Sequence, residues 1–306
     1  MSKLLVIGAG LIGRPLAQRL AARGDAVTIA TRSGSTAAGA TALVLDASNP
    51  AALTRAATDA STIFLCTNPP YTDWAAQWPP IYEAVVAAAS ATGAKVVVMG
   101  NLYSYGSPTG AMTEHSSETT TEAKGLIRRA GWAKLLAAHD VGHIRAVEVR
   151  ASDYFGPGAM GTAHLGESFF RSVLRSKTAR VVGEPALAHS WSYLPDIVTT
   201  LIAAADHTGD WGRLWHVPSG TFSRVDIAGQ LNAHYGTRGK VSGYPQLLLR
   251  SLGLASPMMQ EVWASSYQFV VPFVIDSTET ERELNVSATP WNEALIATAE
   301  SYRRTT

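Results

Sequence analysis

The sequence predicts an α/β fold, with a doubly wound parallel sheet in the first half and a smaller, mainly helical lobe at the C-terminal end. Three observations support this prediction. Short β-branched runs alternate with longer helical patterns up to residue 150, the runs are apolar almost without interruption, and the alternation ends near residue 153. Uninterrupted apolar strands separated by helices are typical of a parallel sheet that is covered by helices on both faces.

Six segments of the first half are predicted strands. They cover residues 4–9, 26–31, 42–47, 62–67, 95–100 and 144–150. Helical patterns such as RPLAQRLAARG, AALTRAATDA and WPPIYEAVVAAASATG lie between them. Because right-handed crossovers bring the C-terminal ends of parallel strands to one edge of the sheet, we expect ligands to bind at that edge.

The second half begins with a glycine-rich loop, YFGPGAMGT, and a helical pattern, HLGESFFRSVLRSK. A strand and loop then lead to a predicted helix at 195–206, followed by a strand in RLWHVPSG, a helix ending at Gly236 and a mainly helical tail. We therefore expect one domain over 1–153, with segments of about 187–236 packing back onto it. A second lobe over 154–306 would close over the edge of the sheet.

Composition excludes several classes of protein. A net charge of +1 over 306 residues gives no concentrated basic surface for nucleic acid or acidic membranes. The single cysteine, Cys66, excludes an internal disulfide framework and a cysteine-rich zinc site, and no metal-ligand motif is present. The N-terminus has no secretory pattern and no run is apolar enough to span a membrane, so we expect a cytoplasmic protein.

A glycine motif follows the first predicted strand. In VIGAGLIGRPLA, Gly8 is placed for a tight turn, Gly10 for close approach of a pyrophosphate to the backbone, and Gly13 for close helix–strand packing. The motif lies between a strand and a helix in a complete βαβ unit, which is the context a dinucleotide site requires. We therefore expect a Rossmann-type domain whose first helix receives the phosphates at its N-terminus.

The end of the second strand indicates which dinucleotide binds. Thr31, Arg32 and Ser33 stand where an NAD-preferring site usually has an acidic residue. A guanidinium flanked by hydroxyl groups suits a 2′-phosphate, so the sequence favours NADP(H) over NAD(H). An exposed Arg32 without a ligand is the alternative interpretation.

Asp46 is placed to hydrogen-bond the adenine, and the residues that end the fourth strand should pass beneath the adenosine ribose. The complete set of expected cofactor contacts is Gly8, Gly10, Leu11, Ile12, Gly13, Thr31, Arg32, Ser33, Asp46, Ala47, Cys66, Thr67, Asn68 and Tyr154.

Several stretches together resemble the NAD-dependent epimerase/dehydratase family, the extended and atypical short-chain dehydrogenases/reductases. They are the N-terminal glycine motif, VVVMGNLYSYG, VEVRASDYFGPG and HSWSYLPDIVTTLIAAA, and they cover most of the chain. The resemblance implies a Rossmann domain with a small C-terminal substrate domain. It also implies chemistry that begins with hydride transfer at a hydroxyl or carbonyl carbon, and a homodimer.

Members of that family use a serine or threonine, a tyrosine, and a lysine four residues after the tyrosine. In this sequence Asn101 stands at the serine position, Glu122 near the tyrosine position and Leu126 near the lysine position. None of the ten tyrosines is followed by lysine at the fourth residue. The usual catalytic pair is therefore absent.

Three interpretations remain. Other groups could transfer the proton, and the leading candidate is Tyr103, because it lies at the carboxyl end of a strand, where the nicotinamide should be. Asn101 could hydrogen-bond a substrate carbonyl. The further candidates for the proton transfer are Tyr105, Glu122, Lys124 and Arg128. The substrate could instead need little acid assistance, as an activated imine or conjugated acceptor would. In the third interpretation the protein binds NADP(H) without turnover, as a redox sensor.

Aromatic residues concentrate near the expected substrate edge. The predicted substrate pocket consists of Tyr71, Trp74, Tyr105, Phe155, His189 and Trp191, with Trp263 and Tyr267 as further candidates. Such walls suit a small, largely apolar substrate. We expect an NADP(H)-dependent oxidoreductase acting on a carbonyl or activated C=N or C=C bond; a nucleotide-sugar epimerase or dehydratase is the alternative among enzymes.

Overall fold

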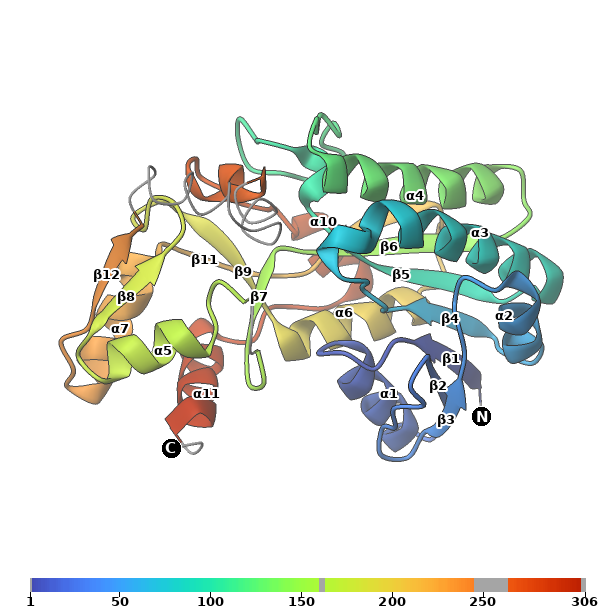
Figure 1. Cartoon of the computed structure of the whole chain (residues 1–306), viewed down its shortest axis with the longest axis horizontal. Helices are drawn as coiled ribbons and strands as arrows, with labels where there is room; N and C mark the ends of the chain where they lie inside the picture. Colours follow the sequence, from blue (N-terminus) through green and yellow to red (C-terminus); the bar gives the residue numbers. More distant parts are fainter. Residues whose placement is uncertain (1, 160–162, 245–263, 304–306) are drawn as a thin grey trace.

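A computed structural model describes residues 2–159, 163–244 and 264–303 (Figure 1). Its centre is a seven-stranded parallel sheet in the order β3-β2-β1-β4-β5-β6-β10. The strands are β1 (Lys3–Ile7), β2 (Ala26–Thr31), β3 (Thr41–Val44), β4 (Thr62–Leu65), β5 (Lys95–Asn101), β6 (Arg145–Ala151) and β10 (Arg213–His216). The predicted Rossmann-type α/β fold is confirmed, and the six expected strands of the first half are all present.

Two helical layers cover the sheet (Figure 1). The helices are α1 (Gly13–Ala22), α2 (Pro50–Ala57), α3 (Trp74–Thr92), α4 (Ala123–Asp140) and α6 (Leu194–Asp206). One face packs against α2, α3 and α4 through a cluster that includes Trp78, Val85 and Leu135, and the other packs against α1 and α6. Strand residues alternate between the two clusters, which is why the strands read as continuous apolar runs.

Local sequence signals account for several helix ends. Asn49 caps α2 by accepting a hydrogen bond from the Ala52 N–H at 3.0 Å, with Pro50 as the first helical residue. Helix α3 ends at Gly93, which has a left-handed backbone with φ of +74°. Helix α4 begins after Glu122, whose carboxylate accepts from the Gly125 N–H at 3.0 Å. Asn49 and Glu122 lie in strand-to-helix connections at the carboxyl edge of the sheet, whereas Gly93 leads from α3 into β5 at the opposite edge.

The second half forms a lobe beside that edge (Figure 1). It contains a three-stranded sheet of β7 (Asp153–Phe155), β9 (His189–Tyr193) and β11 (Gly220–Phe222), and a parallel pair of β8 (Thr178–Val181) and β12 (Lys240–Gly243). Its helices are α5 (Glu167–Leu174), α7 (Arg224–Tyr235) and α11 (Trp291–Arg303), and α10 (Thr278–Leu284) lies against β10 and α6. The helical lobe is present and additionally carries these short strands.

Three single-turn 3₁₀ segments complete the description: η1 (Tyr71–Asp73), η2 (Tyr103–Tyr105) and η3 (Ser266–Phe269). The chain returns from the lobe to the first domain, because α6 covers the sheet and β10 pairs with β6 in parallel. Across the described ranges no helix has the length and apolar character needed to cross a membrane.

Candidate functional site

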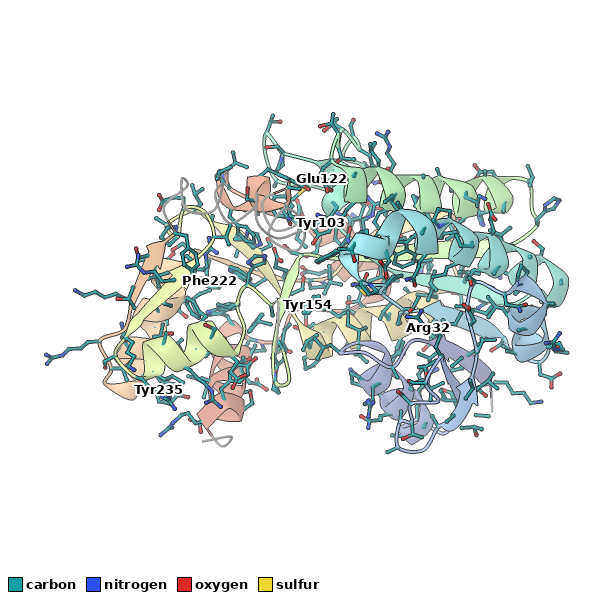
Figure 2. All side chains as sticks on the ribbon, in the orientation of Figure 1. Arg32, Tyr103, Glu122, Tyr154, Phe222 and Tyr235 are labelled. Carbon is teal, nitrogen blue, oxygen red and sulfur yellow. The ribbon has the colours of Figure 1, made fainter. Side chains whose placement is uncertain are left out.

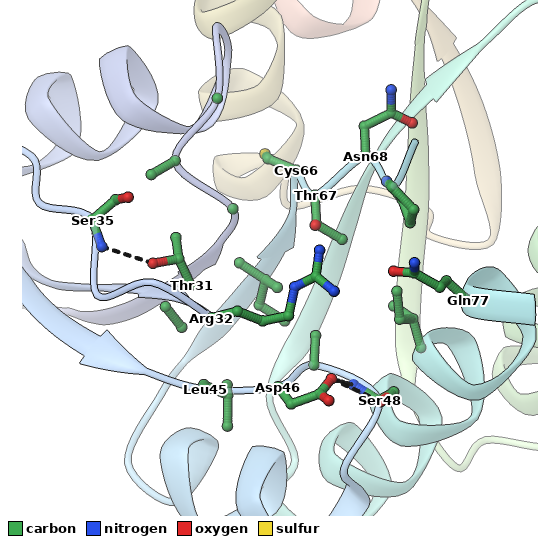
Figure 3. Close-up of a pocket in the computed structure, with 18 of the residues that line it drawn as sticks. Thr31, Arg32, Ser35, Leu45, Asp46, Ser48, Cys66, Thr67, Asn68 and Gln77 are labelled. Carbon is green, nitrogen blue, oxygen red and sulfur yellow. Dashed lines mark hydrogen bonds between the residues drawn. The ribbon is translucent and has the colours of Figure 1, made fainter. Parts of the chain in front are cut away.

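A cavity of about 660 Å³ lies at the carboxyl ends of β1, β2 and β4 (Figure 3). Its walls come from the loops that follow β1, β2, β3 and β4, and from the first turns of α3. Of the expected cofactor contacts, those on its wall are Gly8, Gly10, Leu11, Ile12, Thr31, Arg32, Ser33, Asp46, Ala47, Cys66, Thr67, Asn68 and Tyr154. Gly13 is the first residue of α1, directly behind the loop.

The glycine loop leaves room that side chains would fill. Gly8 has φ of +103°, and a Cβ there would come within 2.8 Å of the Thr67 backbone. A Cβ on Gly13 would approach the Gly8 carbonyl oxygen to 2.0 Å, so α1 packs this closely only with glycine. A Cβ on Gly10 would meet nothing within 4 Å, because this position borders the open cavity. No side chain caps the first turn of α1, whose N–H groups therefore face the space that a pyrophosphate would use.

The turn after β2 carries hydroxyl groups and one guanidinium. The Ser35 N–H donates to the Thr31 Oγ1 at 2.8 Å, and the Ser33 and Ser35 hydroxyls lie 2.9 Å apart. Figure 3 shows the Arg32 guanidinium extending across the cavity wall between Thr67 and Asp46. A ligand at this corner would meet a positive charge and several hydroxyl donors.

Asp46 is held by its own turn. Its Oδ1 accepts hydrogen bonds from the Ser48 N–H at 2.9 Å and from the Ser48 hydroxyl at 2.7 Å. These bonds, aided by the charge of Arg32, hold the pKa of Asp46 below its ordinary value despite partial burial. Asp46 is thus an ionised acceptor on the cavity wall. Cys66 differs, because burial raises the pKa of its thiol to about 12 and keeps it neutral.

Some cavity residues were not expected from the sequence. They are Ile7, Ala9, Ala30, Ser35, Leu45, Ser48, Pro69, Ala76, Gln77, Pro80 and Ile81. Pro69 precedes η1, and Ala76, Gln77, Pro80 and Ile81 lie on α3, in or next to the stretch PPYTDWAAQWPP that follows β4. The sequence shows that this stretch follows a strand end, but it does not indicate which of its residues line the cavity.

The expected catalytic residues gather on the neighbouring strand end. Asn101 ends β5, and its Oδ1 accepts from the Tyr103 N–H at 3.2 Å, so this amide oxygen holds the turn. The Tyr103 hydroxyl lies 3.1 Å from the Tyr71 hydroxyl, and Trp74 packs against both rings. Burial raises the pKa of Tyr103 well above its ordinary value. Figure 2 shows Tyr103 beside Glu122 on the side of the molecule where α4 begins.

Lys124 lies in the first turn of α4 and is 2% exposed. Its ammonium is 3.3 Å from a Glu122 carboxylate oxygen and 5.3 Å from the centre of the Tyr71 ring. The structure thus places Lys124 against a tyrosine from another segment of the chain. Glu122 serves as the helix cap and Leu126 is 38% exposed, so neither side chain substitutes for the absent tyrosine–lysine pair.

Most of the expected substrate-pocket aromatics are packed inside the protein. Trp74, Tyr105, Phe155 and Trp191 are each no more than 2% exposed. The Trp74 N–H donates to the Pro69 carbonyl at 2.9 Å, the Trp191 N–H to the Phe222 carbonyl at 3.0 Å, and the Tyr105 hydroxyl is bonded to His216 at 2.8 Å. The structure therefore places these four side chains in the core, where packing explains them. Tyr71 and His189 remain beside polar groups, and Trp263 lies outside the described residues.

A polar cluster on the lobe was not expected. The Asp153 carboxylate is 2.8 Å from His189 Nε2, and the nearby His164 and Arg224 surround the ring of Phe269 together with His189. Arg224 is 3% exposed and its Nη2 donates to the Val182 carbonyl at 2.7 Å. Burial lowers the pKa of Arg224 to about 10. The described residues contain no group of three or more His, Cys, Asp or Glu side chains arranged for a metal ion.

Comparison with known proteins agrees with this geometry. Residues 8–141 match the family model described as NAD(P)H-binding. This part of the chain is therefore similar to an NAD(P)H-binding domain. No curated protein sequence matches the chain.

Solved structures share the fold over nearly the full length. UDP-glucuronic acid 4-epimerase from Bacillus cereus, solved with NAD, is 16% identical, covers 99% of both chains and has a TM-score of 0.78. UDP-glucose 4-epimerase from Thermotoga maritima, solved with UDP-glucose, is 14% identical with 99% coverage of both chains and a TM-score of 0.80. An epimerase from Methanothermobacter thermautotrophicus is 17% identical, covers 99% of this chain and 93% of that chain, and has a TM-score of 0.79.

The chain thus has the fold of these epimerases. This confirms the resemblance to the epimerase/dehydratase family that the motifs indicated, in the nucleotide-binding half and in the fold as a whole.

Proposed function

We propose that this protein is an NADP(H)-dependent oxidoreductase of atypical short-chain type. It would reduce a carbonyl or an activated C=N or C=C bond in a small, largely apolar substrate. The observation that carries the NADP(H) assignment is the corner after β2, where Arg32 and the hydroxyls of Thr31, Ser33 and Ser35 meet at the cavity wall. Bound NADPH would supply the hydride.

The chain's own residues supply the remaining functions. The glycine loop and the start of α1 hold the diphosphate, Arg32 holds the 2′-phosphate, and Asp46 accepts a hydrogen bond from the adenine. The partly buried tyrosine hydroxyls beside β5 offer a proton at the edge where the nicotinamide would lie. Trp74 excludes water from that edge by filling the space between η1 and η2.

The second candidate is a nucleotide-sugar epimerase, and the fold comparison favours it. The similar structures include epimerases solved with NAD and with UDP-glucose. An epimerase returns its cofactor to the starting redox state in every cycle, whereas a reductase consumes NADPH in proportion to product. A non-catalytic NADP(H) sensor is the third candidate, supported by the absence of the usual tyrosine–lysine pair.

The cofactor assignment is tested with Arg32→Glu. Titration of NADPH and NADH by fluorescence should show that this change weakens NADPH binding by at least tenfold, because a carboxylate replaces the partner of the 2′-phosphate. NADH binding should change much less. Equal losses for the two cofactors would contradict the 2′-phosphate assignment.

The reaction class is tested with the unchanged protein. A panel of aldehydes, ketones and imines is screened for loss of NADPH absorbance. UDP-glucose and UDP-glucuronic acid are screened by NMR, with NAD⁺ or NADP⁺ supplied, for a change of configuration without net reduction of the cofactor. Stoichiometric oxidation of NADPH supports the reductase. Sugar inversion would establish the epimerase instead, and tight NADPH binding with no turnover in either screen would favour the sensor.

A further inference from the structure

Two tyrosine hydroxyls from separate segments meet beside the cofactor cavity. Tyr71 begins η1, two residues after Pro69 on the cavity wall, and Tyr103 begins η2 after β5. Their oxygen atoms are 3.1 Å apart. Trp74 packs against the rings of both, with centroid distances of 5.2 Å and 6.1 Å, and its indole is anchored on the Pro69 carbonyl. The pair is therefore held in place by a buried wall.

One cation accompanies this pair. The Lys124 ammonium lies 5.3 Å from the centre of the Tyr71 ring, and the Glu122 carboxylate at 3.3 Å orients it there. Lys124 is almost fully buried, so its charge acts with little screening by solvent. A phenolate delocalises its negative charge over the ring, and a cation at the ring face therefore stabilises the ionised form.

The two hydroxyls are not equivalent. Lys124 lies against the Tyr71 ring, and if Tyr71 loses its proton the Tyr103 hydroxyl remains as a hydrogen-bond donor to the oxyanion. Burial raises the pKa of Tyr71, and the Asp153 and Glu122 carboxylates raise it as well, while the Tyr103 hydrogen bond and the Lys124 charge act in the opposite direction. Burial raises the pKa of Tyr103 as well, and there the neighbouring Tyr71 raises it further.

Tyr71 is also near the cofactor wall. Tyr154, which lines the cavity, interacts electrostatically with Tyr71, and burial raises its pKa to about 12. From these contacts we propose that Tyr71 is the catalytic acid, and that Tyr103 and Lys124 are positioning residues that act through it. This inference rests on the proposed reductase function and assigns Tyr71, expected from the sequence only to contact substrate, a chemical role.

The proposed step transfers a hydride from NADPH and a proton from Tyr71 to the substrate. The substrate carbon accepts a hydride from NADPH while the C=O π bond breaks, and the carbonyl oxygen takes the proton of the Tyr71 hydroxyl. The substrate gains two electrons and NADPH is oxidised to NADP⁺. The Tyr71 oxyanion accepts the hydrogen bond of Tyr103 and lies under the Lys124 charge until solvent returns a proton. In the reverse direction the same oxyanion removes the proton of the alcohol.

The test compares tyrosine-to-phenylalanine variants. Tyr71→Phe should lower kcat on the best carbonyl of the panel by at least about 100-fold, because a general acid is lost, and should leave the NADPH dissociation constant unchanged. Tyr103→Phe should cost less, about tenfold, because it removes one hydrogen bond to the oxyanion. Tyr235→Phe is the matched control, since Tyr235 lies at the far end of the lobe and bonds to Glu300 (Figure 2).

The role of Lys124 is tested with one variant that removes its charge and one that keeps it. Lys124→Met should lower kcat by a larger factor than it changes KM. It should also move the pH profile of alcohol oxidation to higher pH. Lys124→Arg, which keeps the charge, should retain part of the kcat that Lys124→Met loses. If Tyr71→Phe keeps its turnover and Tyr103→Phe loses it, Tyr103 is the acid and the proposal is overturned. Full turnover in both variants also overturns it, because no tyrosine acid is then needed.

A second measurement does not depend on turnover. In protein labelled with ¹³Cζ-tyrosine, Tyr71 should ionise at lower pH than Tyr103, and Lys124→Met should move the Tyr71 titration upward by about one pH unit. The reverse order, or no shift, contradicts the proposal. If NADPH binds but no substrate turns over, the proposed function fails while this titration still decides whether Tyr71 is the activated phenol.

Discussion

Arg32 and Asp153 illustrate how the surroundings of one charged side chain decide what it can do. Arg32 is exposed on a cavity wall among hydroxyl groups, where its charge is available to a phosphate. Asp153 is mostly buried and accepts a hydrogen bond from His189. Burial opposes its ionisation, but the His189 bond together with His164 and Arg224 outweighs burial, so the pKa of Asp153 lies below its ordinary 3.8.

This depressed pKa predicts a pH dependence of stability. The contribution of Asp153 is fully present above about pH 4 and is lost as pH falls through its lower folded value. Asp153→Asn should lower the free energy of unfolding by about 1.5 kcal/mol at pH 7, because a hydrogen bond to a charged group becomes neutral. The difference from wild type should shrink between pH 4 and pH 2 in urea titrations. A pH-independent difference would contradict this.

Helical elements tolerate glycine for different reasons. Gly229 lies in the middle of α7, is exposed, and a Cβ there would meet nothing within 4 Å. Gly131 lies in α4, where a Cβ would meet the Tyr82 ring of α3 at 2.0 Å. The first glycine therefore costs helix stability without a packing benefit, whereas the second allows α3 and α4 to pack closely.

Substitution by alanine should separate the two cases. Gly229→Ala should raise the free energy of unfolding by about 0.5 to 1 kcal/mol, because it removes backbone freedom from the unfolded chain. Gly131→Ala should lower it by about 1 to 3 kcal/mol through overpacking against Tyr82. Urea unfolding followed by circular dichroism measures both. The same sign for the two variants would contradict this account of α3–α4 packing.

Across the whole molecule, a buried network of charges connects the sheet to α4 and to the loop after η2. Arg150 on β6 donates from Nε to Glu148 at 2.8 Å and pairs with Glu118, and Arg128 on α4 lies 3.6 Å from Glu148. Gly100 on β5 makes room, since a Cβ there would approach the Glu148 carboxylate to 2.6 Å. The network therefore lies against the end of β5, which leads into η2 and Tyr103.

Removing one member of this network should be costly. Glu148→Gln should lower the free energy of unfolding by about 3 kcal/mol, because two buried guanidinium groups lose the carboxylate between them. The control is Glu83→Gln, which breaks the exposed pair with Lys134 and should cost less than about 1 kcal/mol. Unfolding is measured in urea, because the denaturant guanidinium chloride is a salt that screens the charges under comparison. Equal effects would show that burial does not govern these pairs.

Sequence patterns correctly predicted the elements around the glycine loop, because the signals for these strands and turns come from short stretches of chain. The six strands of the first half, the glycine loop and the helix ending at Gly236 are all in place. Aromatic composition did not indicate which of the aromatic side chains are buried. Every residue of β9 is buried, so Trp191 lies inside although its neighbours in sequence are polar. A single sequence does not distinguish a buried aromatic from one that lines a pocket.

By itself the sequence determined the α/β class, the position of the glycine loop and the residues at the strand ends. These follow from side-chain periodicity, turn chemistry and the handedness of crossovers, which act over short stretches of chain. Only the tertiary structure decided that Lys124 on α4 meets Tyr71 on η1, and that Tyr103 completes the pair. The physical reason is that these residues share no helix face or strand register, so packing of distant segments alone brings them together.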